Sequence, residues 1–147
     1  MQSRRHFAFF DIAYHGLADG CDKDAYSWRL FADMGLDMLV CQSFSKNFGL
    51  YRERAGTLHL VCPNRGVGEN VKSQLFTLIR SEYSTNPLYG ARIVTIILSD
   101  GQLRADWETE LHEIRSRMKK LRSSLVGQLK QLKASTPVSD HPRLGFL

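Results

Sequence analysis

The chain has 147 residues, of which 43% are hydrophobic and 24% charged, an ordinary composition for a globular protein with a sizeable core. Its formal net charge of +5 is only mildly basic, so we expect no nucleic-acid partner. No apolar run approaches the roughly 18 residues that a transmembrane helix requires, and we expect no membrane span. Three cysteines, Cys21, Cys41 and Cys62, lack paired spacing, which favours reduced thiols and a cytoplasmic location.

The first part of the chain is predicted to form a strand, a helix and a second strand. Residues 6–10 are a short apolar run, as in a buried strand. Asp22 is a suitable N-cap for a helix over residues 23–34, and Gly35 suits its end. Residues 36–41 form the next apolar run. A strand–helix–strand unit predicts a right-handed crossover and a pair of parallel strands.

The middle of the chain adds a third strand and two helices. Residues 56–62 read as a strand and residues 63–68 as a loop. Apolar spacing predicts a helix over residues 69–82. A break at Asn86-Pro87 separates it from a nearly all-apolar helix over residues 89–98.

One long amphipathic helix is predicted over residues 103–132. Its apolar side chains recur every three or four positions, at Trp107, Leu111, Ile114, Met118, Leu121, Leu125, Leu129 and Leu132. Acidic residues come early and residues 115–133 carry the positive charge, which complements the helix dipole. The stripe indicates packing against other parts of the protein. Residues 135–147 then predict a loop that begins a strand at residues 144–146.

The most informative segment is residues 43–51, a polar turn that follows an apolar strand. It places Lys46 close to a serine, with Arg54 shortly after it. Asp11 and Tyr14 follow the first predicted strand. Because the carboxyl ends of parallel strands share one edge, these side chains are expected to open onto the same crevice. Carboxylate, phenol, lysine, serine and arginine are the groups needed to hold and tune pyridoxal phosphate.

Four of these residues also have a plainer interpretation. Lys46 could be a surface charge, and Asp11 a turn or cap residue. Tyr14 could be a partly buried packing residue. Arg54 could form a surface ion pair with Glu53.

The motifs together resemble the aspartate aminotransferases, members of the fold-type I group of pyridoxal-phosphate enzymes. The resemblance rests on residues 9–16, on residues 42–51 with Glu53 and Arg54, and on residues 90–94. The second motif is the most specific, because it is long and includes both the lysine and the arginine. The resemblance implies an α/β fold, with a mostly parallel sheet from part of the large domain followed by a long connecting helix.

The resemblance also implies a domain organisation. Residues 1–100 correspond to part of the cofactor-binding large domain, residues 101–134 to a long interdomain helix and residues 135–147 to the start of the small domain. Roughly the first half of such an enzyme and the end of its small domain have no counterpart here. We therefore expect an internal segment or a truncated form.

The resemblance assigns a role to each candidate residue around pyridoxal 5′-phosphate. Lys46 would form the Schiff base and, once displaced by substrate, move a proton as general base and acid. Asp11 would pair with the pyridine nitrogen, and Tyr14 would donate to the ring oxygen. Ser43 and Arg54 would bind the phosphate, Arg54 through a bidentate fork.

Arg80 is the expected substrate-binding residue. The resemblance implies that it crosses a dimer interface and holds the distal carboxylate of aspartate or glutamate in the partner's site. Its plainer interpretation is a charge near the end of an amphipathic helix. The expected reaction is reversible amino transfer between an acidic amino acid and a 2-oxo acid in a homodimer. No metal site is expected, because the five histidines lack ligand spacing.

Other functions remain open at the level of sequence. The family's upstream phosphate turn and second substrate arginine have no counterpart, so a truncated form could be a non-catalytic binding or dimerisation partner. The basic helix of residues 115–133 could bind nucleic acid, with steep salt dependence. A decarboxylase or another transaminase would not need the clamp at Arg80. Ile12 and His15 replace the family's usual small residue and amide.

Overall fold

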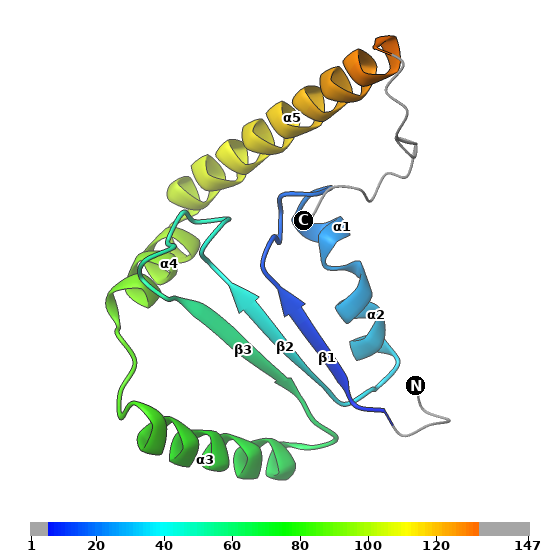
Figure 1. Cartoon of the computed structure of the whole chain (residues 1–147). Helices are drawn as coiled ribbons and strands as arrows, with labels where there is room; N and C mark the ends of the chain where they lie inside the picture. The colour runs from blue at the N-terminus through cyan, green and yellow to red at the C-terminus, as the bar shows by residue number, and fades with distance from the viewer. Residues whose placement is uncertain (1–5, 133–147) are drawn as a thin grey trace.

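The computed structural model describes residues 6–132, which form an α/β arrangement around a three-stranded sheet. The strands are β1 (Ala8–Ile12), β2 (Met38–Ser43) and β3 (Gly56–Val61), in the spatial order β1-β2-β3. Helices α1 and α2 lie beside β1, whereas α3 lies near β3 and α5 extends away from the sheet (Figure 1). The predicted α/β class and long helix are confirmed.

The sheet is mixed. β1 and β2 pair in parallel, with Ala8 opposite Met38, as the strand–helix–strand pattern predicts. β3 runs antiparallel to β2, with Ser43 opposite Gly56. Residues 44–55 connect these two strands without a crossover helix. A parallel neighbour needs a longer crossover, so the chain returns along β2 in the opposite direction.

Two short helices, α1 (Cys21–Asp24) and α2 (Tyr26–Asp33), replace the single helix expected over residues 23–34. The prediction that Asp22 is the N-cap is wrong. Asp22 lies in the first turn of α1, and Gly20 occupies the N-cap position. Asp24 is the carboxylate that holds this region. It accepts hydrogen bonds from the backbone N–H groups of Gly16 and Asp19, each at 2.8 Å.

The core lies between α2 and one face of the sheet. Ala8, Met38 and Val40 are buried there. Partly buried side chains pack around them, namely Phe10, Ile12, Trp28, Phe31 and Val61. This packing fixes β1 against β2 and so sets the relative position of the loops that follow them.

The remaining helices are α3 (Arg65–Glu82), α4 (Tyr89–Ser99) and α5 (Gly101–Gln131). α3 begins earlier than predicted, because the Asn64 side chain caps it by accepting a 3.0 Å hydrogen bond from the Val67 N–H. Most of the expected loop over residues 63–68 is therefore the first turn of α3. α4 and α5 match their predicted spans closely, and the Asp100 carboxylate caps α5.

Burial falls along the apolar stripe of α5. Leu111 is 3% exposed, whereas Leu121 is 61% and Leu132 77% exposed. Packing between α5 and the other described residues is therefore concentrated near its beginning. The predicted strand at residues 144–146 and the segment 135–147 lie outside the described residues.

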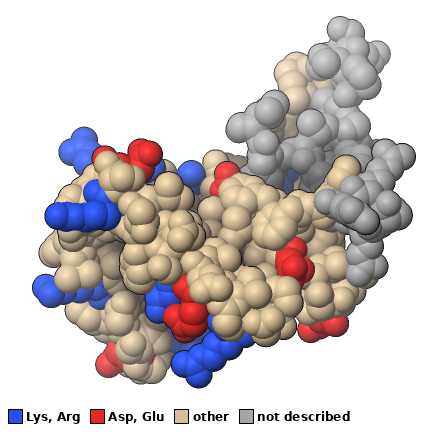
Figure 2. All heavy atoms as spheres, turned by 90° about the horizontal axis from the view of Figure 1, so that it is seen from below, with Lys and Arg blue, Asp and Glu red and all other residues tan. Residues whose placement is uncertain are grey.

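The described surface carries both signs of charge. On the face in Figure 2, Lys and Arg side chains lie among acidic and uncharged residues. None of the described helices combines the length and the apolar character needed to cross a membrane. Within residues 6–132, no group of three His, Cys, Asp or Glu side chains is arranged to hold a metal ion. Cys21, Cys41 and Cys62 are free thiols.

Candidate functional site

The carboxyl ends of β1 and β2 meet at one edge of the sheet, because these two strands are parallel. Asp11 is exposed near the end of β1, and Ser43 is the last residue of β2. Tyr14 lies in the loop after β1, and Lys46 and Arg54 lie in the loop after β2. The predicted cofactor residues thus all lie at or just beyond these two strand ends.

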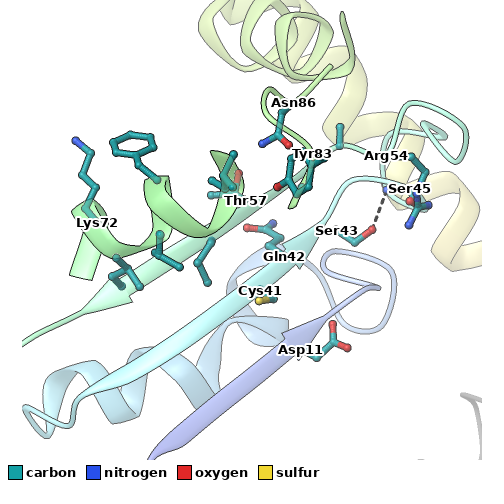
Figure 3. A pocket seen from close by; sticks show the side chains of 17 residues that line it. Asp11, Cys41, Gln42, Ser43, Ser45, Arg54, Thr57, Lys72, Tyr83 and Asn86 are labelled. Atoms are coloured by element: carbon teal, nitrogen blue, oxygen red, sulfur yellow. Dashed lines mark hydrogen bonds between the residues drawn. The ribbon is translucent and has the colours of Figure 1, made fainter. Parts of the chain in front are cut away.

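A pocket of about 720 Å³ lies between the sheet and α3. Its lining includes Asp11, Ser43 and Arg54, which lie toward one end of the close-up in Figure 3, with Lys72 toward the other. Apolar side chains from β3 and α3 line the space between them: Leu58, Leu60, Leu75, Phe76 and Ile79. Alternation along the strands places this pocket on the sheet face opposite the core. The pocket therefore unites an apolar wall with a carboxylate, a hydroxyl and a guanidinium.

Lys46 and Tyr14 come together beside this pocket. The Lys46 Nζ atom lies 5.1 Å from the centroid of the Tyr14 ring. The described residues that line the larger pocket include neither side chain. Asp11 and Tyr14 both line a neighbouring hollow of about 340 Å³, so Asp11 borders both spaces. Tyr14 thus shares this hollow with Asp11, and the Lys46 amine lies over the Tyr14 ring.

The turn after β2 is held by hydrogen bonds between residues that are close in sequence. The Ser43 hydroxyl accepts a 3.2 Å hydrogen bond from the backbone N–H of Ser45, which is 5% exposed. Arg54 has a φ of 50°, and its guanidinium donates to the Tyr51 carbonyl at 3.1 Å. A left-handed backbone costs a non-glycine residue roughly 1–2 kcal/mol, and the surrounding turn must offset that cost.

Asn47 anchors the same turn, although the sequence analysis did not single it out. It is 4% exposed, and its Nδ2 donates to the His15 carbonyl at 3.3 Å. The indole of Trp107 donates to the Asn47 carbonyl at 2.7 Å. Asn47 Oδ1 is buried with no hydrogen-bond partner among the described residues. The one signal in the sequence that could have identified Asn47 was its position next to Lys46. Its hydrogen-bond partners, His15 and Trp107, are distant in sequence and could not be predicted from it.

The loop after β1 is anchored to α5. Arg115 donates to the Gly16 carbonyl at 2.9 Å, and the Lys119 amine lies 2.7 Å from the Asp19 carboxylate. The hydrogen bond and charge of Lys119 hold the pKa of Asp19 below its ordinary value. Burial raises the pKa of the nearby Cys21 thiol. α5 thus helps to fix the loop that carries Tyr14.

Close packing at Gly90 fixes the segment next to Arg54. A Cβ at Gly90 would lie 2.7 Å from the Glu53 Cβ and 2.9 Å from the Ala55 Cβ. Gly90 is buried in the first turn of α4. The absence of a side chain there lets α4 approach the loop directly.

Arg80 lies apart from this group. It is exposed in the last turn of α3, and its guanidinium donates to the Ser84 hydroxyl. Ile79 and Tyr83 on either side of it line the pocket, whereas Arg80 is not among the described lining residues. Its expected role concerns a partner subunit's site and stays a prediction.

Two sequence comparisons relate the chain to known proteins. The family model for aminotransferase class I and II matches residues 1–143. The aminotransferase tasG of Hapsidospora irregularis is 57% identical over 102 residues, covering 69% of this chain and 31% of that protein. The aspartate aminotransferase of Haemophilus influenzae is 45% identical over 130 residues, covering 88% of this chain and 33% of that protein.

Solved structures show the same relationship. The aspartate aminotransferase of Trypanosoma cruzi matches with a TM-score of 0.86 and 48% identity, covering 96% of this chain and 36% of that one. An aromatic-amino-acid aminotransferase from Burkholderia pseudomallei, covalently bound to pyridoxal phosphate, matches with a TM-score of 0.86 and 42% identity, covering 88% and 33%. The chain spans about a third of the length of these relatives. Because the family model covers nearly all of its residues, the chain belongs to the class I and II aminotransferases.

Proposed function

We propose that this chain contributes the lysine-bearing part of a pyridoxal-phosphate site in an aspartate-aminotransferase-like protein. The reaction would transfer an amino group between aspartate or glutamate and a 2-oxo acid. Family membership and the aspartate aminotransferases among the relatives support this reaction class. The observation that carries the proposal is the grouping of Asp11, Ser43 and Arg54 around one pocket, with the Lys46 amine and Tyr14 ring beside it.

The donor set at this edge suits the cofactor. Arg54 and Ser43 supply the cation and hydroxyl that a phosphate group requires, and Asp11 supplies a carboxylate for a pyridinium nitrogen. The pocket has apolar walls and a volume of about 720 Å³, within the range typical of cofactor sites. When bound, pyridoxal phosphate would supply an electron sink for a carbanion at the amino acid's α-carbon.

The protein's own residues would then have distinct tasks. Lys46 would hold the cofactor through a Schiff base at rest and, when released, take the proton from the substrate α-carbon. Asp11 would keep the pyridine nitrogen protonated, and Tyr14 would donate a hydrogen bond to the ring oxygen. Arg54 would orient the phosphate with two N–H donors.

The proposal extends to the assembly. Arg80 would reach across a homodimer interface to the distal carboxylate of the substrate. Residues 1–100 would form part of the large domain, residues 101–134 the interdomain helix and residues 135–147 the start of the small domain. A cytoplasmic location stays a prediction, which the free thiols support.

Reductive labelling tests the cofactor site. The purified chain is incubated with pyridoxal phosphate, reduced with borohydride and mapped by mass spectrometry. Stoichiometric label on Lys46 is expected. Lys46→Arg should abolish it, whereas Lys72→Arg, at the far end of the pocket, should retain it. Label scattered over several lysines, or none, would contradict the proposal.

A second candidate function is a non-catalytic binding or dimerisation partner. It gains support from the exposed apolar side chains of α5, including Leu121 and Leu125. Label on Lys46 without amino transfer from aspartate would favour it. Turnover by the 147-residue chain would exclude it.

A further inference from the structure

His15 joins the two loops of the candidate site. Its backbone carbonyl accepts a hydrogen bond from Asn47 Nδ2 at 3.3 Å. Since Asn47 directly follows Lys46 and His15 directly follows Tyr14, this bond ties the amine-bearing turn to the phenol-bearing loop. The Lys46 Nζ atom lies 5.1 Å from the Tyr14 ring centroid next to this tie.

The His15 imidazole is itself held at both nitrogens. Its Nε2 lies 2.9 Å from the carbonyl oxygen of Cys21, and its Nδ1 lies 3.0 Å from Gln42 Nε2. The Trp28 ring packs against the imidazole in a T-shaped arrangement, with ring centroids 5.4 Å apart and 71° between the planes. The ring is half-buried, so neither a rotation nor a displacement of the imidazole is free of cost.

The direction of these hydrogen bonds follows from their partners. A backbone carbonyl only accepts, so His15 Nε2 must carry the proton. In the neutral ring Nδ1 is then an acceptor, which matches the NH₂ group of Gln42. The Oε1 atom of Gln42 in turn lies 3.4 Å from His59 Nε2. The result is a directional chain from His59 through Gln42 and His15 to the Cys21 carbonyl.

We propose that His15 is a positioning residue, which holds Tyr14 against Lys46 through this hydrogen-bond chain. His15 is not among the described residues lining the larger pocket, so it would act through its neighbours. Its meaning for amino transfer rests on the proposed function, since that is what gives the Lys46 amine a task. The orientation itself is a property of the chain without cofactor.

Two substitutions separate this role from simple packing. Glutamine at this position offers an NH₂ group as donor and a carbonyl oxygen as acceptor, so His15→Gln can donate to the Cys21 carbonyl and accept from Gln42. His15→Leu fills similar space and offers neither. A positioning role therefore predicts rescue by glutamine and loss with leucine.

The test is NMR on the 147-residue chain without cofactor, with ¹⁵N-labelled histidine and ¹³C-labelled lysine. We expect the His15 shifts of a ring protonated at Nε2 alone, and a Lys46 ε-methylene signal shifted upfield by the Tyr14 ring. Tyr14→Leu should remove that shift and so assign it. His15→Leu should lose it as well, whereas His15→Gln and the control His6→Leu, at an exposed histidine before β1, should keep it.

Three results would overturn the inference: mixed tautomers at His15, an unchanged Lys46 signal in His15→Leu, or loss of that signal in His15→Gln. If His15→Leu fails to fold, Gln42→Glu decides, because a carboxylate only accepts and His15 Nδ1 must then become protonated. An unchanged ring in Gln42→Glu would refute the directional chain. Since no cofactor is used, failure of the Lys46 labelling with these NMR results intact would count against the proposed function alone.

Discussion

The indole Nε1 of Trp107 donates a 2.7 Å hydrogen bond to the backbone carbonyl of Asn47, 60 positions earlier in the chain. The Trp107 ring also stacks on Phe48, with centroids 4.6 Å apart and 15° between the planes. α5 therefore does more than extend away from the sheet, because its first turns hold the turn that carries Lys46.

Replacing Trp107 separates these two contacts. Trp107→Phe should keep an aromatic ring on Phe48 and leave the Asn47 carbonyl without its donor, which lowers the free energy of unfolding by about 1–3 kcal/mol. Trp107→Leu should cost more, because the stack is lost too. Urea unfolding measures both. Equal stability of Trp107→Phe and the parent would contradict the role of the hydrogen bond.

A methyl group at Gly90 should disrupt the contact between α4 and the Arg54 segment. Gly90→Ala places a Cβ within 2.9 Å of the Glu53 and Ala55 Cβ atoms, so we expect a loss of about 1–3 kcal/mol in unfolding free energy. Gly127→Ala on α5 is the matched control, since nothing lies within 4 Å of its Cβ. That change should stabilise the chain by up to about 1 kcal/mol. The same thermal or urea unfolding experiment compares them, and a neutral Gly90→Ala would refute the close contact.

The guanidinium of Arg54 should matter for the phosphate and not for the ring of the cofactor. Arg54→Lys keeps the charge and loses the bidentate geometry, so affinity for pyridoxal phosphate should fall by roughly tenfold, about 1.4 kcal/mol. Affinity for pyridoxal, which lacks the phosphate, should stay unchanged. Absorbance titration measures both ligands. Arg52→Lys is the control, and an equal loss for both ligands would point to a disrupted loop instead.

The Asp19–Lys119 pair should give a pH-dependent contribution to stability. Lys119 lowers the pKa of Asp19 in the folded state, so the contribution is present above the unfolded pKa and is lost as the pH falls through the folded one. Lys119→Met should therefore lower the Tm at pH 7, with the difference from the parent vanishing at strongly acidic pH. High salt should shrink the difference, because both groups are exposed. Lys120→Met serves as control. A difference that persists in acid would assign the effect to packing.

Local signals in the sequence predicted much of the fold. Gly35 ends the helical region with a φ of 65°, as its position after an apolar run indicated. The span of α5 followed from its apolar spacing. The choice of Asp24 over Asp22 could not be predicted, because both are acidic residues near a helix start. It depends on where the backbone N–H groups of Gly16 and Asp19 point, which is a tertiary property.

The candidate site, like the fold, could be predicted only in part from the sequence. The motif around Lys46 and the two strand ends located the chemical groups. Strand alternation and strand pairing then decide which of these groups line the pocket. Asp11 and Ser43 line it, whereas the Lys46 amine lies over the Tyr14 ring. The Trp107–Asn47 bond and the ring of His15 depend on contacts between distant segments, which no spacing in one sequence reveals.

The order β1-β2-β3 leaves two strands with one paired side each within residues 6–132. The outer backbone N–H and C=O groups of β1 and β3 can act as templates for added strands, and Phe9, 61% exposed, lies on one of them. Self-association of the purified chain should therefore grow with its concentration. Labelling and NMR results obtained over a dilution series would distinguish properties of the single chain from those of strand-paired aggregates.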